Sequence, residues 1–303
     1  MMKCVSVLFL LLFAWQFSTE VNADNNRPVP PLGNSSLKVT GIQPGPSQMS
    51  ELLSSAHANQ YLGQATTDSK PEQVEGVPAD VHEFYFSRGI YSGEFDDLDE
   101  GGRWAVDYPK ADHQFLVALK RLSILDAYDS DNAIGLTDPK LRRFPLLYVV
   151  EVGSMTLNNA EVLALRTYLQ AGGFLVVDDF WGSWAWEQFE SQMQKVFPDR
   201  PIVELPLDHP VFHIFYNIDK VLQVPNVHQG WSAAQGGPTH EYDGIVPHVR
   251  GIFDDEGRLM VLINWNTDLG DAWEWADDPE YPLKYSTYAF KIGINFVIYA
   301  MTH

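Results

Sequence analysis

The sequence has few cysteines and few positive charges, and both shortages exclude functions. Its 303 residues contain one cysteine, Cys4, and 20 Lys and Arg against 40 Asp and Glu, a formal net charge of −20 at pH 7. Such an acidic surface cannot displace the counterions of phosphate, so we expect no nucleic-acid partner and no docking on anionic lipid. The sequence also lacks the G-x-S-x-G, Walker, G-x-G-x-x-G and H-E-x-x-H motifs. Standard serine hydrolysis, nucleotide triphosphate chemistry and Rossmann-type hydride transfer therefore have no support.

The first 23 residues have the pattern of a secretory signal peptide. Lys3 precedes a mainly apolar, uncharged run over 5–17, and Val21-Asn22-Ala23 fits a small-residue cleavage site. The run is shorter than the ~20 residues that span a bilayer, and an uncleaved anchor is the alternative. We expect an extracytoplasmic protein, periplasmic or secreted, with no membrane insertion beyond this segment. Because Cys4 lies inside it, the mature chain would have no disulfide and no thiolate nucleophile.

Two regions follow the signal. Residues 24–79 are rich in proline and polar residues, with Tyr61 as the one aromatic residue, and predict a flexible linker. From residue 80 strand-like and helix-like patterns alternate, which predicts an α/β domain over 80–303. We expect a three-layer sandwich with a mostly parallel sheet and helices on both faces. Expected strands cover 84–86, 146–150, 174–177 and 202–205, with a hairpin over 251–263; expected helices cover 111–123, 158–170, 182–197 and 285–301.

Two carboxylates stand at the end of a buried strand, in Asp178-Asp179-Phe180-Trp181-Gly182. Ligands of parallel α/β sheets bind beyond the carboxyl ends of the strands, so Asp178 and Asp179 are the first candidate site. Adjacent carboxylates there could bind a metal, hold a cationic ligand, or share a proton as acid and base. The structural alternative is that Asp179 caps the following helix and Asp178 pairs with a buried arginine.

Two further windows combine acids with tryptophan. Residues 94–107 hold six acids and one base, Arg103, and residues 266–280 hold six acids and no base, so together they carry −11 of the net charge of −20. Trp104 lies in the first window, and Trp273 and Trp275 lie in the second. Aromatic rings with carboxylates suit a sugar, a cation or a basic peptide. The alternative is a pair of loops whose tryptophans pack on each other.

A pair of histidines occurs in Asp208-His209-Pro210-Val211-Phe212-His213. Two histidines four residues apart could bind zinc, but no third ligand is evident nearby. The structural alternative is that Pro210 opens a helix at its first position, with Asp208 or His209 as the cap.

Taken in order, these motifs resemble an uncharacterised bacterial family, domain of unknown function 4159. The resemblance covers roughly residues 80–303 and is carried by the stretches 84–91, 104–112, 172–182, 207–212 and 264–274. It implies a flavodoxin-like fold similar to class I glutamine amidotransferases. Those enzymes carry a cysteine at the elbow after the buried strand, where this chain has residues 178–182. The mature chain has no cysteine, so glutaminase activity through a thioester is excluded.

These observations favour a non-glutaminase domain that binds a glycan or a cation at the carboxyl edge of the sheet. The alternatives are a metal-assisted or paired-carboxylate hydrolase, and an acidic module that binds a basic protein partner in the cell envelope. No cofactor is identified, although a divalent metal ion could bind. Candidate catalytic residues are Asp178, Asp179 and His209. Candidate ligand-binding residues are Arg88, Trp104, Asp107, Asp112, Trp181, Asp208, Asn266, Asp268, Asp271, Trp273 and Glu274.

Two of these hypotheses, the metal site and the glycan site, make geometric predictions. A metal site requires that at least three of five side chains converge within ligand distance: Asp107, Asp178, Asp179, His209 and Asp268. A glycan site requires an open groove with an exposed tryptophan face, and fully buried rings at 104, 181, 273 and 275 would contradict it.

Overall fold

The computed structural model describes residues 82–94 and 102–303; the expected signal peptide, the linker over 24–79 and Cys4 lie outside these residues. One seven-stranded sheet has the order β2-β1-β3-β4-β7-β6-β5. The first five strands of this order are parallel, whereas β6 runs antiparallel to both neighbours. The predicted mostly parallel α/β sheet is therefore confirmed. The strands are β1 (Ser87–Ile90), β2 (Asn132–Gly135), β3 (Leu146–Val150), β4 (Phe174–Asp178), β5 (Val203–Glu204), β6 (His248–Phe253) and β7 (Leu259–Trp265).

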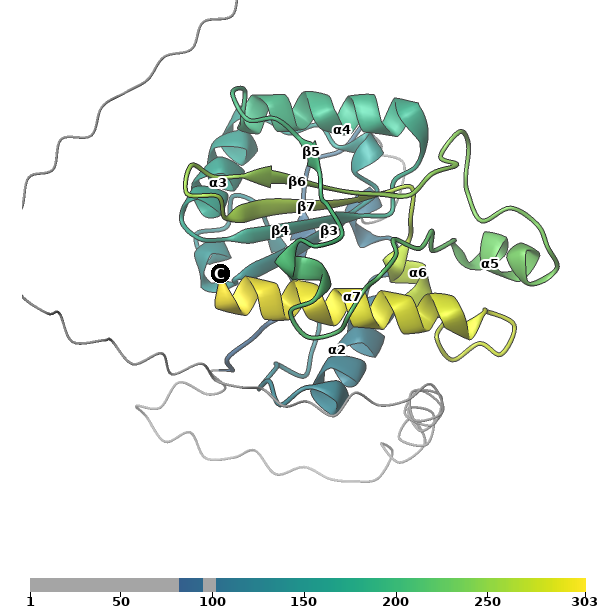
Figure 1. Ribbon diagram of the computed structural model, residues 1–303. Helices are drawn as coiled ribbons and strands as arrows, with labels where there is room; N and C mark the ends of the chain where they lie inside the picture. Colours follow the sequence, from purple (N-terminus) through teal and green to yellow (C-terminus); the bar gives the residue numbers. More distant parts are fainter. Residues whose placement is uncertain (1–81, 95–101) are drawn as a thin grey trace, which may run out of the picture. The chain divides into compact units, whose positions relative to one another are not determined.

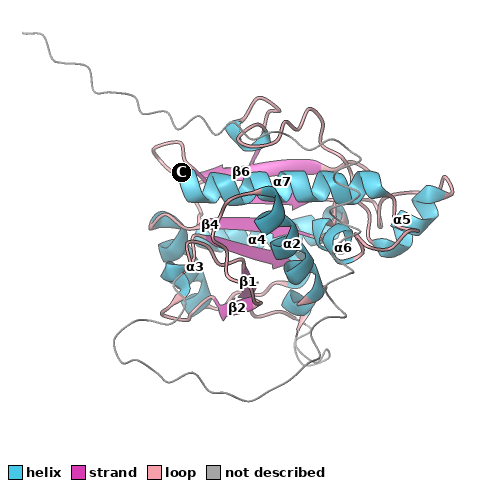
Figure 2. Ribbon diagram, turned by 90° about the horizontal axis from the view of Figure 1, so that it is seen from below, coloured by secondary structure: helices cyan, strands magenta, loops and turns pink. Residues whose placement is uncertain are grey.

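Helices cover both faces of the sheet. Helices α2, α6 and α7 pack in one core layer, and α3 and α4 pack in the other (Figure 1). Figure 2, viewed from below, places α7 and α2 in front of the strands and α4 behind them. The helices are α2 (Lys110–Leu122), α3 (Asn159–Gln170), α4 (Gly182–Val196), α5 (Val227–Ala234), α6 (Leu269–Glu274) and α7 (Leu283–Thr302), with short 3-10 turns η2 (Arg103–Ala105), η3 (Leu141–Arg143), η4 (Val152–Ser154) and η5 (Pro210–Phe212).

The two central strands are buried along their whole length because both of their faces are covered, and all their residues except Tyr148 and Asp178 are purely apolar. All five residues of β3 and all five of β4 are buried. Along β3, Leu147 and Val149 belong to the core layer that contains α3 and α4, whereas Leu146, Tyr148 and Val150 belong to the opposite layer. This alternation is the period of two that a strand imposes on its side chains.

The elements with local sequence signals form as predicted. The Asn158 side chain accepts hydrogen bonds from the backbone N–H groups of Ala160 and Glu161, and Glu161 accepts one from the Asn158 N–H, so the capping box starts α3. Strand β3, helices α2, α4 and α7, and the β6–β7 hairpin also lie within a few residues of their expected bounds. The hairpin turns through Gly257, whose φ of 84° suits glycine.

The expected strand over 84–86 is wrong in position. The strand is Ser87–Ile90, and Phe84 makes only an isolated bridge to Ala127. Ser87-Arg88-Gly89 resembles the end of a strand, yet Gly89 is required inside it, because a Cβ there would lie 2.7 Å from Val149 Cγ1 of the neighbouring strand. Strand β2 and helix α5 have no counterpart in the sequence-based prediction.

The expected strand over 202–205 is short, since β5 contains only Val203 and Glu204, both exposed at the edge of the sheet. Within the described residues, no helix combines the length and the apolar character needed to cross a membrane.

Candidate functional site

The residues that leave three parallel strands share an unusual backbone conformation. Glu151 follows β3, Asp179 follows β4 and Asn266 follows β7, with φ angles of 54°, 49° and 62°. Backbone hydrogen bonds join these exits: the Glu151 N–H donates to the Asp179 carbonyl at 2.9 Å, and the Asp179 N–H donates to the Thr267 carbonyl at 3.1 Å. The left-handed region is costly for residues other than glycine, and such strain gathers at functional sites. The carboxyl edge of the sheet is therefore the first place to look.

Five carboxylates converge at this edge, and we call them the acidic cluster: Asp107, Asp179, Asp268, Asp271 and Glu274. One oxygen from each of Asp107, Asp179 and Asp268 lies within 4.8 Å of the other two. Asp107, Asp271 and Glu274 form a second set with the same spacing. Asp107 belongs to both sets and also has a left-handed backbone, with φ of 62°. The convergence that a metal site requires is thus present for three of the five residues considered.

The five side chains of the cluster come from three segments of the chain, and α6 with its N-cap contributes three of them. Asp107 precedes α2, Asp179 follows β4, and Asp268 is the N-cap of α6, accepting a hydrogen bond from the Asp271 N–H at 2.7 Å. Asp271 accepts a further one from the Val227 N–H, at the start of α5, also at 2.7 Å. The loop around residue 107 and helix α6, which are far apart in sequence, therefore meet beside the end of β4.

The electrostatics of the cluster favour neutralisation of its charge. Burial, followed by repulsion from neighbouring acids, raises the pKa of Asp107, Asp179 and Asp268 well above the ordinary range. Burial also raises the pKa of Asp271 and of Glu274, the latter partly offset by Lys110, whose Nζ lies 3.9 Å from Glu274 Oε1. Carboxylates removed from water in this way must either hold protons or share a cation.

One atom of the cluster has no partner. Asp107 Oδ2 is shielded from solvent and makes no hydrogen bond with any described residue. A buried acceptor that is left unsatisfied costs free energy, so such atoms in native structures call for an unseen partner or a functional reason.

Asp178 has a structural role beside the cluster. It is fully buried, and its Oδ2 accepts hydrogen bonds from the Tyr148 hydroxyl at 2.7 Å and from the N–H groups of Leu269 and Gly270 at 2.8 and 3.3 Å. Burial raises its pKa to about 7. Asp178 thus holds the start of α6 against β4, and its partner is not the arginine that the structural alternative predicts.

Asp179 does not cap the helix that follows it. The N-cap position of α4 is Trp181, and its side chain makes no capping hydrogen bond. The acceptor for the Ser183 N–H is instead Asp243, from a distant loop, at 3.0 Å. Asp179 Oδ1 accepts a hydrogen bond from Trp181 Nε1 at 3.2 Å, so this predicted ligand-binding tryptophan packs next to the cluster and is buried.

Arg88 and Asp112 form a buried ion pair near Asp107 of the cluster. Both side chains are fully buried and joined by two hydrogen bonds, and Arg88 Nη1 also donates to the Val106 carbonyl at 3.1 Å. The guanidinium lies 4.9 Å from the centre of the Tyr148 ring. Its positive charge lowers the pKa of Asp107, against the larger effect of burial. Neither side chain is exposed to a ligand. The pair therefore acts on the site only indirectly, through the charge of Arg88 near Asp107.

The tryptophans of the two acidic windows belong mainly to the core. Trp273 is 1% exposed, with its ring centre 4.5 Å from that of Phe115. Trp104 and Trp275 are half-buried. The glycan hypothesis requires an exposed tryptophan ring. Such a ring is found at a different residue, Trp184 on α4, which is 62% exposed.

Asp208 and His209 lie away from the cluster. His209 caps η5 by accepting from the Val211 N–H at 3.3 Å, and its ring packs against Phe253 at the end of β6. Since β6 is antiparallel, this end lies at the opposite edge of the sheet. His213 Nε2 contacts the Leu207 carbonyl at 2.6 Å. The histidine spacing therefore reflects the structural alternative, with Pro210 at the first position of the turn.

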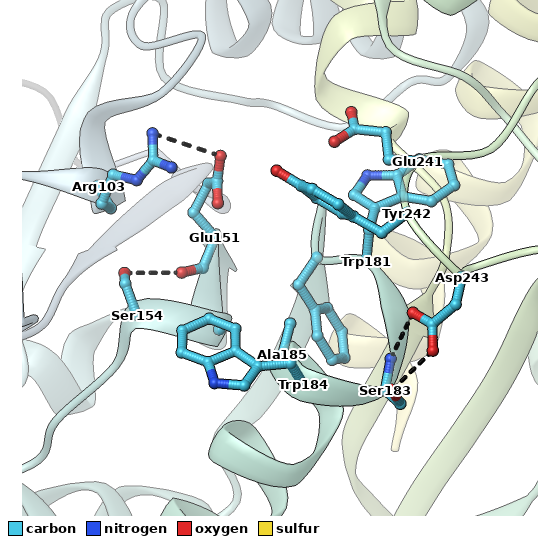
Figure 3. A pocket seen from close by; sticks show the side chains of 12 residues that line it. Arg103, Glu151, Ser154, Trp181, Ser183, Trp184, Ala185, Glu241, Tyr242 and Asp243 are labelled. Carbon is cyan, nitrogen blue, oxygen red and sulfur yellow. Dashed lines mark hydrogen bonds and ion pairs between the residues drawn. The ribbon is translucent and has the colours of Figure 1, made fainter.

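A pocket of about 640 Å³ lies beside the cluster, at the exits of β3 and β4 (Figure 3). Arg103 and Glu151 line it from one side, 3.7 Å apart between Nη1 and Oε1, and Glu241 and Tyr242 line it from the other. Asn266, a predicted ligand-binding residue, joins the start of α4 to the loop after Asp243: it accepts from the Gly182 N–H at 2.9 Å and donates to the Val246 carbonyl at 2.7 Å. Sequence reasoning missed Glu151, Trp184, Glu241 and Tyr242 as residues of a site.

The fold and the site together define an α/β domain with a buried carboxylate cluster and a neighbouring pocket at the carboxyl edge of a mostly parallel sheet. The chain belongs to the family described as a domain of unknown function (DUF4159), which it matches over residues 94–301. The family expected from the sequence motifs is thereby confirmed. A search of curated proteins found no match to the chain.

Proposed function

We propose that this chain is an exported domain that binds a hard divalent cation, Ca²⁺, Mg²⁺ or Mn²⁺, in the acidic cluster. The observation that supports the proposal is the convergence of Asp107, Asp179 and Asp268 within 4.8 Å. The buried Asp107 Oδ2, which has no hydrogen-bond partner among the described residues, supports it independently. Export rests on the signal-like pattern of residues 1–23.

The donor set determines the class of cation. Both groups of three consist of carboxylates and contain neither histidine nor cysteine. Oxygen donors suit Ca²⁺, Mg²⁺ and Mn²⁺, whereas zinc and copper favour nitrogen and sulfur. A divalent cation would replace protons that the raised pKa values otherwise require, and it would reduce the repulsion among the five acids.

The topology supports the finer inference that the fold is flavodoxin-like, similar to class I glutamine amidotransferases. The parallel strands have the order β2-β1-β3-β4-β7, which corresponds to the flavodoxin-like order 2-1-3-4-5. Folds of this order bind ligands between the loops that follow the first and third strands. Here Arg103 comes from the connection after β1 and Glu151 from the connection after β3, and both line the pocket.

The test is a calorimetric titration of the full chain with each of the three cations after dialysis against EDTA. We expect at least one to bind, and we expect Asp179→Asn and Asp268→Asn to weaken that binding at least tenfold. Asp219→Asn, at an exposed position outside the cluster, is the matched control and should bind like the wild type. In EDTA the two cluster variants should be at least as stable as the wild type, because each removes a repelling charge. The proposal is overturned if no cation binds, or if all three variants bind equally.

A further inference from the structure

We propose that the pocket at the exits of β3 and β4 is a second site, distinct from the acidic cluster, which binds a protonated organic amine. Its lining contains none of the five cluster residues. The inference goes beyond the cation site and does not depend on it, since it is argued from the charge, the exposed rings and the rigidity of the pocket itself.

The lining of the pocket has an excess of negative charge. It includes three carboxylates, Glu151, Glu241 and Asp243, and one guanidinium, Arg103. Asp243 is already engaged at both oxygens by Ser183, through the N–H at 3.0 Å and the hydroxyl at 2.6 Å. Glu151 pairs with Arg103 at 3.7 Å and Glu241 accepts a hydrogen bond from Asn226, and these two carboxylates lie on opposite walls of the open space (Figure 3). A ligand that enters between them meets two carboxylates and a single, partly paired guanidinium, which favours a positive charge.

The surroundings increase this preference. Glu151 is close enough to the buried Asp179, and Asp271 close enough to Glu241, for their charges to interact. Any negative charge that the cluster retains therefore adds to the negative potential of the pocket. A cation with a +2 charge in the cluster would reduce this potential, but the two glutamates that line the pocket would stay in place.

Aromatic faces complete the requirements for an amine. Trp184 is 62% exposed and Tyr242 is 82% exposed, although rings of this size are usually covered. In Figure 3 the Tyr242 hydroxyl is directed across the pocket toward Glu151, and the Trp184 indole closes the lower side. A cation that lies against such faces gains attraction from the ring quadrupole, most strongly with tryptophan.

The exposed wall of the pocket is held rigidly. Tyr242 has a left-handed backbone with φ of 46°, an outlier for a bulky residue. The next residue, Asp243, fastens this loop to the start of α4, and a Cβ at Gly182 would lie only 2.3 Å from Asp243 Oδ1. A pocket wall that is fixed before the ligand arrives loses little entropy on binding. Backbone strain of this kind gathers at ligand-binding sites, which supports a functional role for this exposed ring.

The amine could be carried by an amino sugar or by a lysine side chain, and matched probes separate these sources from a neutral sugar. The full chain, with EDTA throughout, is titrated with glucosamine and N-acetylglucosamine, and with Nα-acetyl-lysine amide and Nα,Nε-diacetyl-lysine amide, so that in each pair acetylation removes the one positive charge. We expect the charged member of at least one pair to bind roughly tenfold more tightly than its acetylated partner. Equal binding within both pairs, or binding of N-acetylglucosamine alone, would overturn the proposal, and so would no binding of any probe.

Variants locate the binding in this pocket. Trp184→Ala and Glu151→Gln should weaken the charged probe roughly threefold to tenfold. Leu163→Ala, on α3 and also 62% exposed, is the matched control and should leave affinity unchanged. Trp184→Ala should retain the divalent cation affinity of the wild type, so failure of the amine site and failure of the cation site give different results. Equal amine affinity in all three variants would place the binding elsewhere and contradict the assignment.

Discussion

Gly270 lies directly against the carboxylate of Asp107. A Cβ atom at position 270 would stand 2.6 Å from Asp107 Oδ2, 3.4 Å from the Tyr148 hydroxyl and 3.5 Å from Asp268 Oδ1. Real Cβ atoms do not approach other atoms at 2.6 Å, so one of the two groups would have to move. The absence of a side chain on α6 at this position is what admits Asp107 to the acidic cluster.

Gly270→Ala should therefore weaken divalent cation binding by displacing Asp107, and we expect a loss of tenfold or more. Alanine is intrinsically favoured over glycine inside helices by about 1 kcal/mol, so a loss of affinity would not follow from helix propensity. The measurement is the calorimetric cation affinity, together with circular dichroism to verify the fold. Gly135→Ala is the control, because nothing lies within 4 Å of a Cβ at that position. Unchanged affinity in Gly270→Ala would show that Asp107 is not a ligand.

The parts of the fold that could be predicted are those with local causes. The Asn158–Glu161 capping box and the apolar run of β3 depend on neighbouring residues, and both formed at the expected positions. Strand β1 could not be placed, since Arg88 is buried in it only because Asp112 on α2 neutralises its charge. That partner is brought close by the tertiary fold, and no local pattern around residue 88 reveals it.

The candidate site also contains residues that the sequence indicated and residues that it did not. The rule that ligands bind at the carboxyl ends of parallel strands pointed to the chain beyond β4, where Asp179 joins the acidic cluster, and the acidic windows contained Asp107 and Asp268. The windows misled about Trp273, whose ring fills the core. Trp184 lies on the polar face of the amphipathic helix α4. This position could have indicated from the sequence that its ring is exposed.

Asp178 should make stability depend on pH in a defined window. Burial raises its pKa to about 7, from about 4 in an unfolded chain. The folded state therefore binds the proton more tightly, so this contribution to stability is complete below pH ~4 and is lost as the pH rises to about 7. The full difference corresponds to roughly 4 kcal/mol.

Asp178→Asn keeps an oxygen acceptor for Tyr148 and for α6 but cannot titrate. Urea unfolding in EDTA at several pH values should show that the free energy of unfolding of the variant, relative to the wild type, increases between pH ~4 and ~7 and is then constant. Parallel pH profiles for the two proteins would mean that Asp178 titrates normally in the folded state.

Removing one partner of the Arg88–Asp112 pair should lower the free energy of unfolding more than removing both partners. Arg88→Leu leaves the Asp112 carboxylate buried without its countercharge, and we expect a loss of about 3–5 kcal/mol in the free energy of unfolding. Arg88→Leu combined with Asp112→Leu removes both charges and should recover part of that loss. Denaturant unfolding of the single and double variants measures the difference. A double variant less stable than the single variant by the full cost of a second independent substitution would show that the pair is not coupled.

Asp243→Ala should loosen the wall of the pocket without removing either aromatic side chain, Trp184 or Tyr242. The substitution removes the acceptor for the Ser183 N–H and hydroxyl, which ties the loop of Tyr242 to the start of α4. Loss of such a helix-start contact typically costs about 1 kcal/mol, so the domain should remain folded. We expect faster amide hydrogen exchange over residues 241–246 and weaker binding of the charged probe, whereas Asp243→Asn, which retains one acceptor oxygen, should lie near the wild type. If the exchange rates increase but the probe binds as before, the rigidity of this wall contributes nothing to recognition, because the rings and the two glutamates then suffice.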